Sequence, residues 1–315
     1  MKVFSRILSI VALAALAVTG TQCRSAKQVP AKALEFALIP AGDFMMGDAL
    51  DGDKDAPPHQ VNVSAFFMQK TEVTKAQWDE VRAWGLKNGY TDLREGKGKA
   101  ADHPVQTISW YDVVKWCNAK SVKDGLSPCY YTDAAQTAVY QTGESNLAST
   151  MVKWSANGYR LPTEAEWEKA ARGGLSGKRF PLGDTISHDQ ANFKNEGKES
   201  YQKGTTGYHP AYKTGGKPYT SPVASFGANG YGLYDMMGNV SELCWDRGEK
   251  YPSGSETDPR GADSSLFPAS PVSRVFRGGL WVDGAGGCRV AVRDFGPPFG
   301  TGSGIGFRVA HSSVP

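Results

Sequence analysis

The apolar residues of this chain fall in short runs that are separated by long glycine-rich stretches. A strand is predicted where such a run is four to eight residues long and rich in branched or aromatic side chains. The predicted strands are Glu35–Ile39, Gln60–Phe67, Val223–Phe226, Arg274–Phe276 and Gly306–Ala310. Few short strands with much ordered coil favour a mixed α+β fold over a parallel, doubly wound sheet.

Three helices are predicted from their start signals. Each begins at a Ser or Thr that is followed three residues later by a side chain able to bond back, as in a capping box. The pairs are Thr74 with Gln77, Ser109 with Asp112 and Thr163 with Glu166. The predicted helices are Thr74–Trp84, Ser109–Lys120 and Thr163–Arg172, and Gly173 stands where the third should end.

The N-terminus has the pattern of an export signal. Lys2 and Arg6 precede an apolar run, Ile7–Val18, which suits a signal peptide and is short for a membrane span. Cys23 is placed as in a bacterial lipoprotein signal, where the cysteine is acylated, although Gln22 stands where a small residue is usual. We therefore expect a signal peptide over 1–23, a tether over 24–33 and one domain over 34–315. Simple secretion is the alternative to a lipoprotein of the outer membrane or cell surface.

Charge and composition exclude some partners. The net charge of +3 comes from 35 basic and 32 acidic residues that are interspersed, and no Lys/Arg cluster stands out in the sequence. Nucleic acid is therefore not a predicted partner. The 37 glycines indicate tight turns in a loop-rich fold.

Eight short motifs occur in one order along the chain. Together they resemble the formylglycine-generating-enzyme (sulfatase-modifying factor) superfamily, whose domain is a type of C-type lectin fold. The motifs are Ile39-Pro40-Ala41-Gly42 with Met46-Gly47, Glu72-Val73-Thr74, His103-Pro104-Val105, the run Tyr159–Glu168, the run Asn229–Met236, Gly238-Asn239-Val240-Ser241-Glu242, Arg277-Gly278-Gly279 and Gly306-Phe307-Arg308.

The resemblance does not extend to the catalytic cysteines. In the formylglycine-generating enzymes, two cysteines downstream of Arg-Gly-Gly bind copper and oxidise a substrate cysteine, which requires thiolate ligands. Here Asp283 stands at the first position, and Cys288 falls beside the second. A lone cysteine cannot supply the pair. The sequence therefore predicts a protein that is not an enzyme and requires no cofactor.

The resemblance also implies a structural Ca²⁺ site. Asn239, the Val240 carbonyl and Glu242 match a segment that coordinates Ca²⁺ in the enzymes, and oxygen ligands suit this cation. Ser241 departs from the family's tryptophan. The acidic loop Asp51–Asp55 lacks the glycine and the glutamate that an EF-hand requires, and is expected to be a solvated loop.

The mature chain would keep an even number of cysteines, Cys117, Cys129, Cys244 and Cys288. In an oxidising compartment these permit two disulfides in three connectivities. The family segments that contain Cys244 and Cys288 favour a disulfide between them, and Cys117 would then pair with Cys129.

The C-terminal segment has a composition of its own. From Arg277 to Pro315 it contains no Lys, Glu, Gln, Met or Asn, and glycines are dense between Gly278 and Gly306. A glycine-rich loop beneath the core would explain this by packing. The segment also resembles the variable region of the variable proteins of diversity-generating retroelements, in which a reverse transcriptase randomises adenines, mostly in AAC codons. The varied codons then cannot encode Lys, Glu, Gln, Met or Trp.

This second resemblance divides residues 277–310 into a fixed frame and tolerant positions. The frame consists of Arg277–Gly279, Trp281, Ala285, Cys288–Ala291, Arg293, Pro298 and Ile305–Arg308. The tolerant positions, expected to bind ligand, are Val282, Asp283, Gly284, Gly286, Gly287, Val292, Asp294, Phe295, Gly296, Pro297, Phe299, Gly300, Gly302, Ser303 and Gly304, with Leu280 at their border.

Three functions follow as hypotheses. The first is a surface-displayed protein that binds an unknown protein or glycan through this segment, with Phe295 and Phe299 as the main contacts, because exposed aromatic side chains supply much contact area. The second is a fixed, non-catalytic module of the same fold. The third is an oxidase like the formylglycine-generating enzymes.

Overall fold

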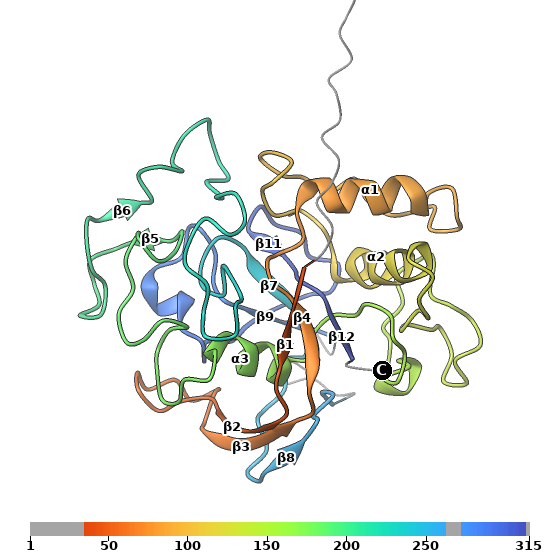
Figure 1. Cartoon of the computed structure of the whole chain (residues 1–315), viewed down its shortest axis with the longest axis horizontal. Coiled ribbons are helices and arrows are strands. Elements are labelled where there is room, and N and C mark those ends of the chain that lie inside the picture. The colour runs from red at the N-terminus through yellow and green to blue at the C-terminus, as the bar shows by residue number, and fades with distance from the viewer. Residues whose placement is uncertain (1–34, 263–271, 313–315) are drawn as a thin grey trace, which may run out of the picture.

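The computed structural model describes residues 35–262 and 272–312. The expected signal peptide, the tether and Cys23 lie outside these ranges. Within them, no helix is both long and apolar enough to cross a membrane. The fold is α+β, with a few helices and many short strands joined by coil, as the sequence predicts (Figure 1).

All three predicted helices form, and each begins at the predicted residue. They are α1 (Lys75–Gly85), α2 (Trp110–Lys123) and α3 (Glu164–Arg172). Thr74, Ser109 and Thr163 are the N-caps, each with a complete capping box. Gly173 ends α3 with a φ of 57°, a left-handed conformation that glycine adopts without steric cost. Two short 3₁₀ turns are η1 (Ser149–Met151) and η2 (Ala285–Cys288).

The central sheet carries the C-terminal segment. Its strand order is β10-β9-β7-β11. The strands are β7 (Ser241–Arg247), β9 (Arg274–Arg277), β10 (Asp294–Gly296) and β11 (Ile305–Gly306). β9 is antiparallel to β7 and β10, whereas β11 runs parallel to β7. The chain therefore leaves this sheet after β9 and returns to it twice, at β10 and at β11.

Three smaller sheets surround the central one. The first has the order β1-β4-β12, with β1 (Phe36–Ile39), β4 (Phe66–Gln69) and β12 (Ala310–Ser312). The second has the order β2-β3-β8, with β2 (Gly42–Met46), β3 (His59–Val63) and β8 (Glu256–Thr257). The third pairs β5 (Lys194–Asn195) with β6 (Gly207–Tyr208). In Figure 1, α1 and α2 lie on one side of β7 and β9, and β5 and β6 lie on the other.

One predicted strand is wrong and two are divided. Residues 223–226 form a turn, because Ala224 has a φ of 58° and its N–H donates to Asp235 Oδ2 at 2.6 Å. The predicted strand Gln60–Phe67 breaks into β3 and β4, and Gly306–Ala310 divides between β11 and β12. An apolar run predicts burial, and its hydrogen-bond partners decide whether it forms a strand.

Candidate functional site

Buried arginines fasten the C-terminal segment to the scaffold. Arg277, at the end of β9, donates to the carbonyls of Val290, Ala291 and Val292 at 2.9, 3.0 and 2.6 Å. Its guanidinium also pairs with Glu168 of α3. One fixed charge therefore holds three consecutive carbonyls, two from the predicted frame and one from the tolerant Val292, as the five donors of arginine allow.

Two further frame arginines extend this attachment. Arg293 binds both oxygens of Glu164 at 2.7 Å, in a bidentate pair beside the ring of Tyr251. Arg289 pairs with Asp51 at 3.0 Å and with Asp53. The sequence predicts that the acidic loop Asp51–Asp55 is solvated, and this prediction is wrong for Asp51 and Asp53. Their carboxylates are the counter-ions of a frame arginine that lies more than two hundred residues further along the chain.

Trp281 is the central apolar side chain of the frame. It is 4% exposed, and its ring packs against Tyr208 and Tyr219 with centroids 5.8 and 5.4 Å away. Its Nε1 donates to the carbonyl of Ser303 at 3.2 Å, and its backbone N–H donates to Asn239 O at 2.9 Å. Trp281 thus joins the start and the end of the segment. All the other predicted frame positions are also buried, except Ile305, which is half-buried.

The tolerant positions lie at the surface, but most of their side chains are only partly exposed. Asp294, Phe299 and Ser303 are exposed, and 60% of the Phe299 surface is accessible. Phe295 is half-buried beneath the Arg293 guanidinium, so it is a weaker contact residue than the sequence suggests. Every other tolerant position is half-buried, apart from Gly304. The frame is thus buried while the positions between its members reach the surface.

Gly304 belongs with the frame, which corrects the sequence assignment. It is buried, and its carbonyl accepts a hydrogen bond from Ser241 N at 2.7 Å. A Cβ added there would lie 2.2 Å from Cδ1 of Leu280. Gly296 and Gly300 are also tight, with added Cβ atoms 2.8 Å from the Phe276 ring and 2.9 Å from the Pro297 carbonyl. By contrast, Gly284, Gly286 and Gly287 would accept a side chain with contacts no closer than 3.2 Å.

Asp283 occupies a sheltered position in the middle of this surface. Its Oδ2 accepts from Leu280 N at 3.1 Å, and its carbonyl accepts from Lys194 N at 2.9 Å. Burial, opposed by the bond from Leu280 and assisted by nearby Asp294, raises the pKa of Asp283 to about 6. Burial also raises the pKa of the Cys288 thiol. Asp283 carries no thiol, and the thiol of Cys288 does not ionise readily. The two residues therefore do not offer the pair of thiolates that the copper chemistry of the enzymes requires.

The structure does not support a calcium site at Asn239, Val240 and Glu242. Arg308 donates to both Glu242 oxygens, at 2.6 and 2.7 Å, and Trp167 Nε1 donates to the same carboxylate at 2.8 Å. Asn239 Oδ1 accepts from Ser221 N at 2.9 Å. The side-chain oxygens of Asn239 and Glu242 are thus already bonded, and a guanidinium lies against the carboxylate that was expected to bind the cation. Among the described residues no group of three or more His, Cys, Asp or Glu side chains is placed to hold a metal.

The predicted disulfides are also corrected. Cys117, Cys129, Cys244 and Cys288 are all buried free thiols. Cys244 packs in the core cluster beneath α3, whereas Cys288 packs in a separate cluster with Phe180 and Phe193. The positions of Cys244 and Cys288 in two family motifs therefore did not predict that they pair, because the two side chains pack in different core clusters.

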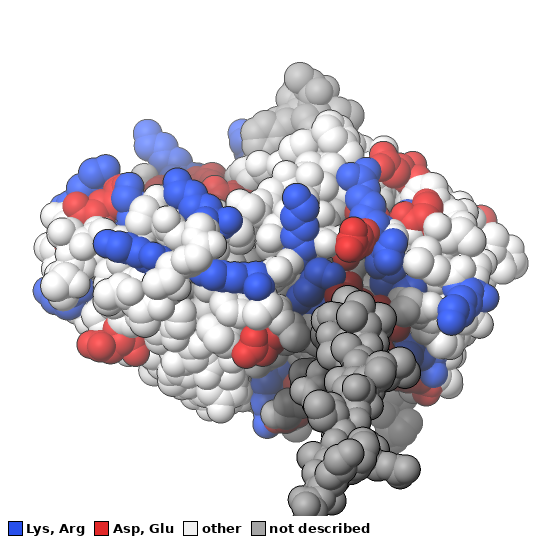
Figure 2. Space-filling view, turned by 90° about the horizontal axis from the view of Figure 1, so that it is seen from above, with Lys and Arg blue, Asp and Glu red and all other residues white. Residues whose placement is uncertain are grey.

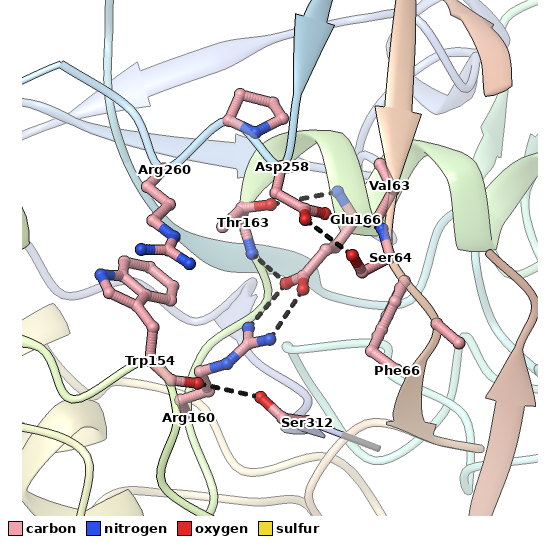
Figure 3. A pocket seen from close by; sticks show the side chains of 12 residues that line it. Val63, Ser64, Phe66, Trp154, Arg160, Thr163, Glu166, Asp258, Arg260 and Ser312 are labelled. Atoms are coloured by element: carbon pink, nitrogen blue, oxygen red, sulfur yellow. Dashed lines mark hydrogen bonds and ion pairs between the residues drawn. The ribbon is translucent and has the colours of Figure 1, made fainter. Parts of the chain in front are cut away.

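A cavity of about 280 Å³ lies near β3, β4 and β12, and no tolerant position lines it. Figure 3 shows its polar groups turned toward one another. Arg160 binds both oxygens of Glu166 at 2.6 and 2.7 Å, and Ser64 Oγ donates to Asp258 at 2.7 Å. Arg260 lies over the Trp154 ring, 4.9 Å from its centroid. The carboxylates of this cavity are thus used in bonds within the protein.

Comparison with known proteins identifies the family. Residues 22–313 match the sulfatase-modifying factor enzyme 1-like domain. The chain belongs to this family. It is 31% identical to the chaperone protein LppX of Paenibacillus barcinonensis, covering 88% of this chain and 89% of that protein. It is also 31% identical to the formylglycine-generating enzyme of Streptomyces coelicolor, covering 87% and 88%.

A solved structure resembles most of this chain. Treponema denticola variable protein 1 aligns with a TM-score of 0.65 and 30% identity, over 88% of this chain and 94% of that one. The formylglycine-generating-enzyme type of fold and the similarity to variable proteins, both expected from the motifs, are therefore confirmed. This chain is thus similar both to proteins named as formylglycine-generating enzymes and to a protein named as a variable protein.

Proposed function

We propose that this protein binds an external ligand through its C-terminal segment and is diversified there by a retroelement. The observation that carries the proposal is the division of the segment into a buried frame and surface positions between the frame residues. Loops on a rigid scaffold can change their side chains without loss of the fold, which is what a variable binding surface requires. The likeness to Treponema denticola variable protein 1 supports the same function.

Display at the cell surface is part of this proposal. The apolar run Ile7–Val18 and Cys23 would export and acylate the protein, and the tether would hold the domain away from the membrane. Metabolic labelling with a fatty acid tests this, since the label should be lost when Cys23 is replaced by serine. An unchanged label in that variant argues against the anchor.

The first prediction concerns tolerance at the exposed positions. A fourfold variant, changed at the exposed Asp294, Phe299 and Ser303 and at the half-buried Val282, should shift the melting temperature by only a few degrees. The reason is that a surface substitution costs about 0.5 kcal/mol or less. Calorimetry measures this. Val290→Ser is the matched control, since it places one hydroxyl in the buried frame and should destabilise more than the four surface changes combined.

The same positions should also determine binding. A displayed library is randomised at these four positions and panned against one purified target protein. It should yield variants that bind the target more tightly than the unmutated protein does. Unfolding of the fourfold variant, or a library of folded members without binders, would argue for a fixed module instead.

Oxidation of a substrate cysteine is the rival function, because a relative of similar identity is named as a formylglycine-generating enzyme. The copper site of such an enzyme does not fit these residues, since Asp283 replaces one thiol and the Cys288 thiol is buried with a raised pKa. We expect no aldehyde when the protein is incubated with Cu(I), oxygen and a cysteine-containing sulfatase peptide. The Streptomyces coelicolor enzyme is the positive control, and comparable turnover would refute the binding function.

A further inference from the structure

A basic groove borders the C-terminal segment. It has a volume of about 510 Å³ and lies between residues 95–99 and residues 215–218. Lys75, Lys97, Lys99 and Lys217 line it, and Glu95 is the acidic residue among its lining. Figure 2, seen from above, shows Lys and Arg side chains predominating along the middle of the visible face. A concave surface with one sign of charge concentrates ligands of the opposite sign.

Some lysines of this groove already bind partners within the protein, and others do not. Lys75 pairs with Asp79, and Lys99 donates to the carbonyls of Tyr212 and Thr214 at 3.2 and 2.6 Å. Lys97 and Lys217 are exposed, and neither has an acidic partner among the described residues. The groove therefore presents two ammonium groups that form no ion pair within the described residues, one from each wall.

Both walls of the groove contact the C-terminal segment. On one wall, Thr107, next to the lining residue Gln106, donates from its N–H to the carbonyl of Gly302 at 3.0 Å. On the other, Tyr219 follows the lining residue Pro218 and packs on Trp281 with centroids 5.4 Å apart. A chain lying in the groove would thus continue onto the exposed positions around Ser303.

The aromatic rings beside the groove distinguish between kinds of anion. Lys99 lies over the Tyr219 ring at 5.7 Å, and Lys194 and Lys217 lie over Tyr208 at 5.9 and 6.0 Å. Nucleobases bind aromatic side chains by stacking on a ring face, and both rings here already pack on Trp281 as well as lying beneath lysines. A ligand that binds through carboxylates alone does not have to stack on these rings, so the groove favours an acidic chain over a nucleic acid.

We propose that this groove binds an acidic peptide segment of a partner protein, through Lys97 and Lys217. The glycines that line both walls, including Gly96, Gly98 and Gly216, carry no side chain that would obstruct an extended chain. This site lies outside the variable segment, so it would supply a constant, charge-based contact beside a surface whose side chains change. It does not depend on the segment being variable.

The test uses a fluorescein-labelled peptide of alternating Glu and Gly, and the same peptide with Gln in place of Glu. The Glu peptide should bind, and its affinity should fall with added salt. The double variant Lys97→Gln/Lys217→Gln should bind about tenfold more weakly, because two exposed charge pairs are lost. The double variant Lys54→Gln/Lys87→Gln has the same net charge but leaves the groove intact, and should bind like the unmutated protein.

Other results would overturn the proposal. An equal loss in both double variants would mean attraction by net charge alone. Tighter, Lys97- and Lys217-dependent binding of dextran sulfate or of an oligothymidine would identify a polysaccharide or nucleic-acid groove. The fourfold variant of the C-terminal positions should retain binding of the Glu peptide, so failure of this inference is distinguishable from failure of the variable-surface proposal.

Discussion

Replacing Arg308 with methionine is expected to lower the free energy of unfolding by about 3–5 kcal/mol, because it leaves buried carboxylates without their cation. Arg308 is fully buried, binds both oxygens of Glu242, and donates to the carbonyls of Gln69, Lys70 and Tyr234. Methionine fills much of the same space and removes every one of these bonds. Denaturant unfolding at neutral pH measures the loss.

The loss should depend on pH, because two more carboxyl groups share this site. Burial raises the pKa of Glu72, and burial raises the pKa of Asp235 to about 6. Both carboxyls favour the protonated form in the folded state, so the stability they contribute is present at low pH. It is lost as the pH rises through their folded-state pKa values. The deficit of Arg308→Met should therefore be smaller at about pH 5 than at about pH 7.5.

A second substitution serves as the control for the ion pair between Arg308 and Glu242. Adding Glu242→Gln to Arg308→Met removes the uncompensated charge and keeps an acceptor for Trp167, so it should restore part of the stability. If the double variant is as unstable as the sum of the two single variants, the ion pair does not explain the effect of Arg308.

Replacing Trp281 with alanine is expected to cost about 3–5 kcal/mol, since it empties a large buried site. The indole fills the space beside Tyr208 and Tyr219, and its N–H holds the Ser303 carbonyl. Loss of the ring should also loosen the far end of the segment. Denaturant unfolding measures the stability, and hydrogen exchange at residues 302–304 measures the local opening.

Trp281→Phe is the matched variant. It keeps an aromatic ring but removes the N–H donor, so it should cost less than the alanine change, with about 1 kcal/mol from the lost hydrogen bond. Equal stability of the alanine variant and the unmutated protein would mean that Trp281 is not part of the frame, and the division into frame and tolerant positions would fail with it.

The starts of the helices were accessible from the sequence because their signals are local, whereas α1 and α2 end later than predicted, at Gly85 and Lys123. Thr74, Ser109 and Thr163 each form hydrogen bonds with a residue three positions away, so chain proximity alone brings the partners together. The family and its fold were also accessible, since ordered motifs cover most of the chain. The alternation of buried frame and surface positions in the C-terminal segment followed from composition and resemblance, but Gly304 proved buried and most other tolerant positions are only partly exposed.

Charge pairing over long distances was decided by the tertiary structure. Asp51 and Asp53 looked like a solvated loop until the fold brought them to Arg289, and Glu242 looked like a cation ligand until Arg308 was placed against it. The cysteines of two adjacent family segments proved to face different core clusters.

The basic groove has the same origin. Lys75, Lys97, Lys99 and Lys217 form no cluster in the sequence, and they share one surface only because the segments that carry them pack together. The local preferences of a side chain depend on its neighbours along the chain, and those neighbours are given directly by the sequence. Which charge meets which other charge depends on the relative placement of distant segments, and that is fixed only when the whole core is packed.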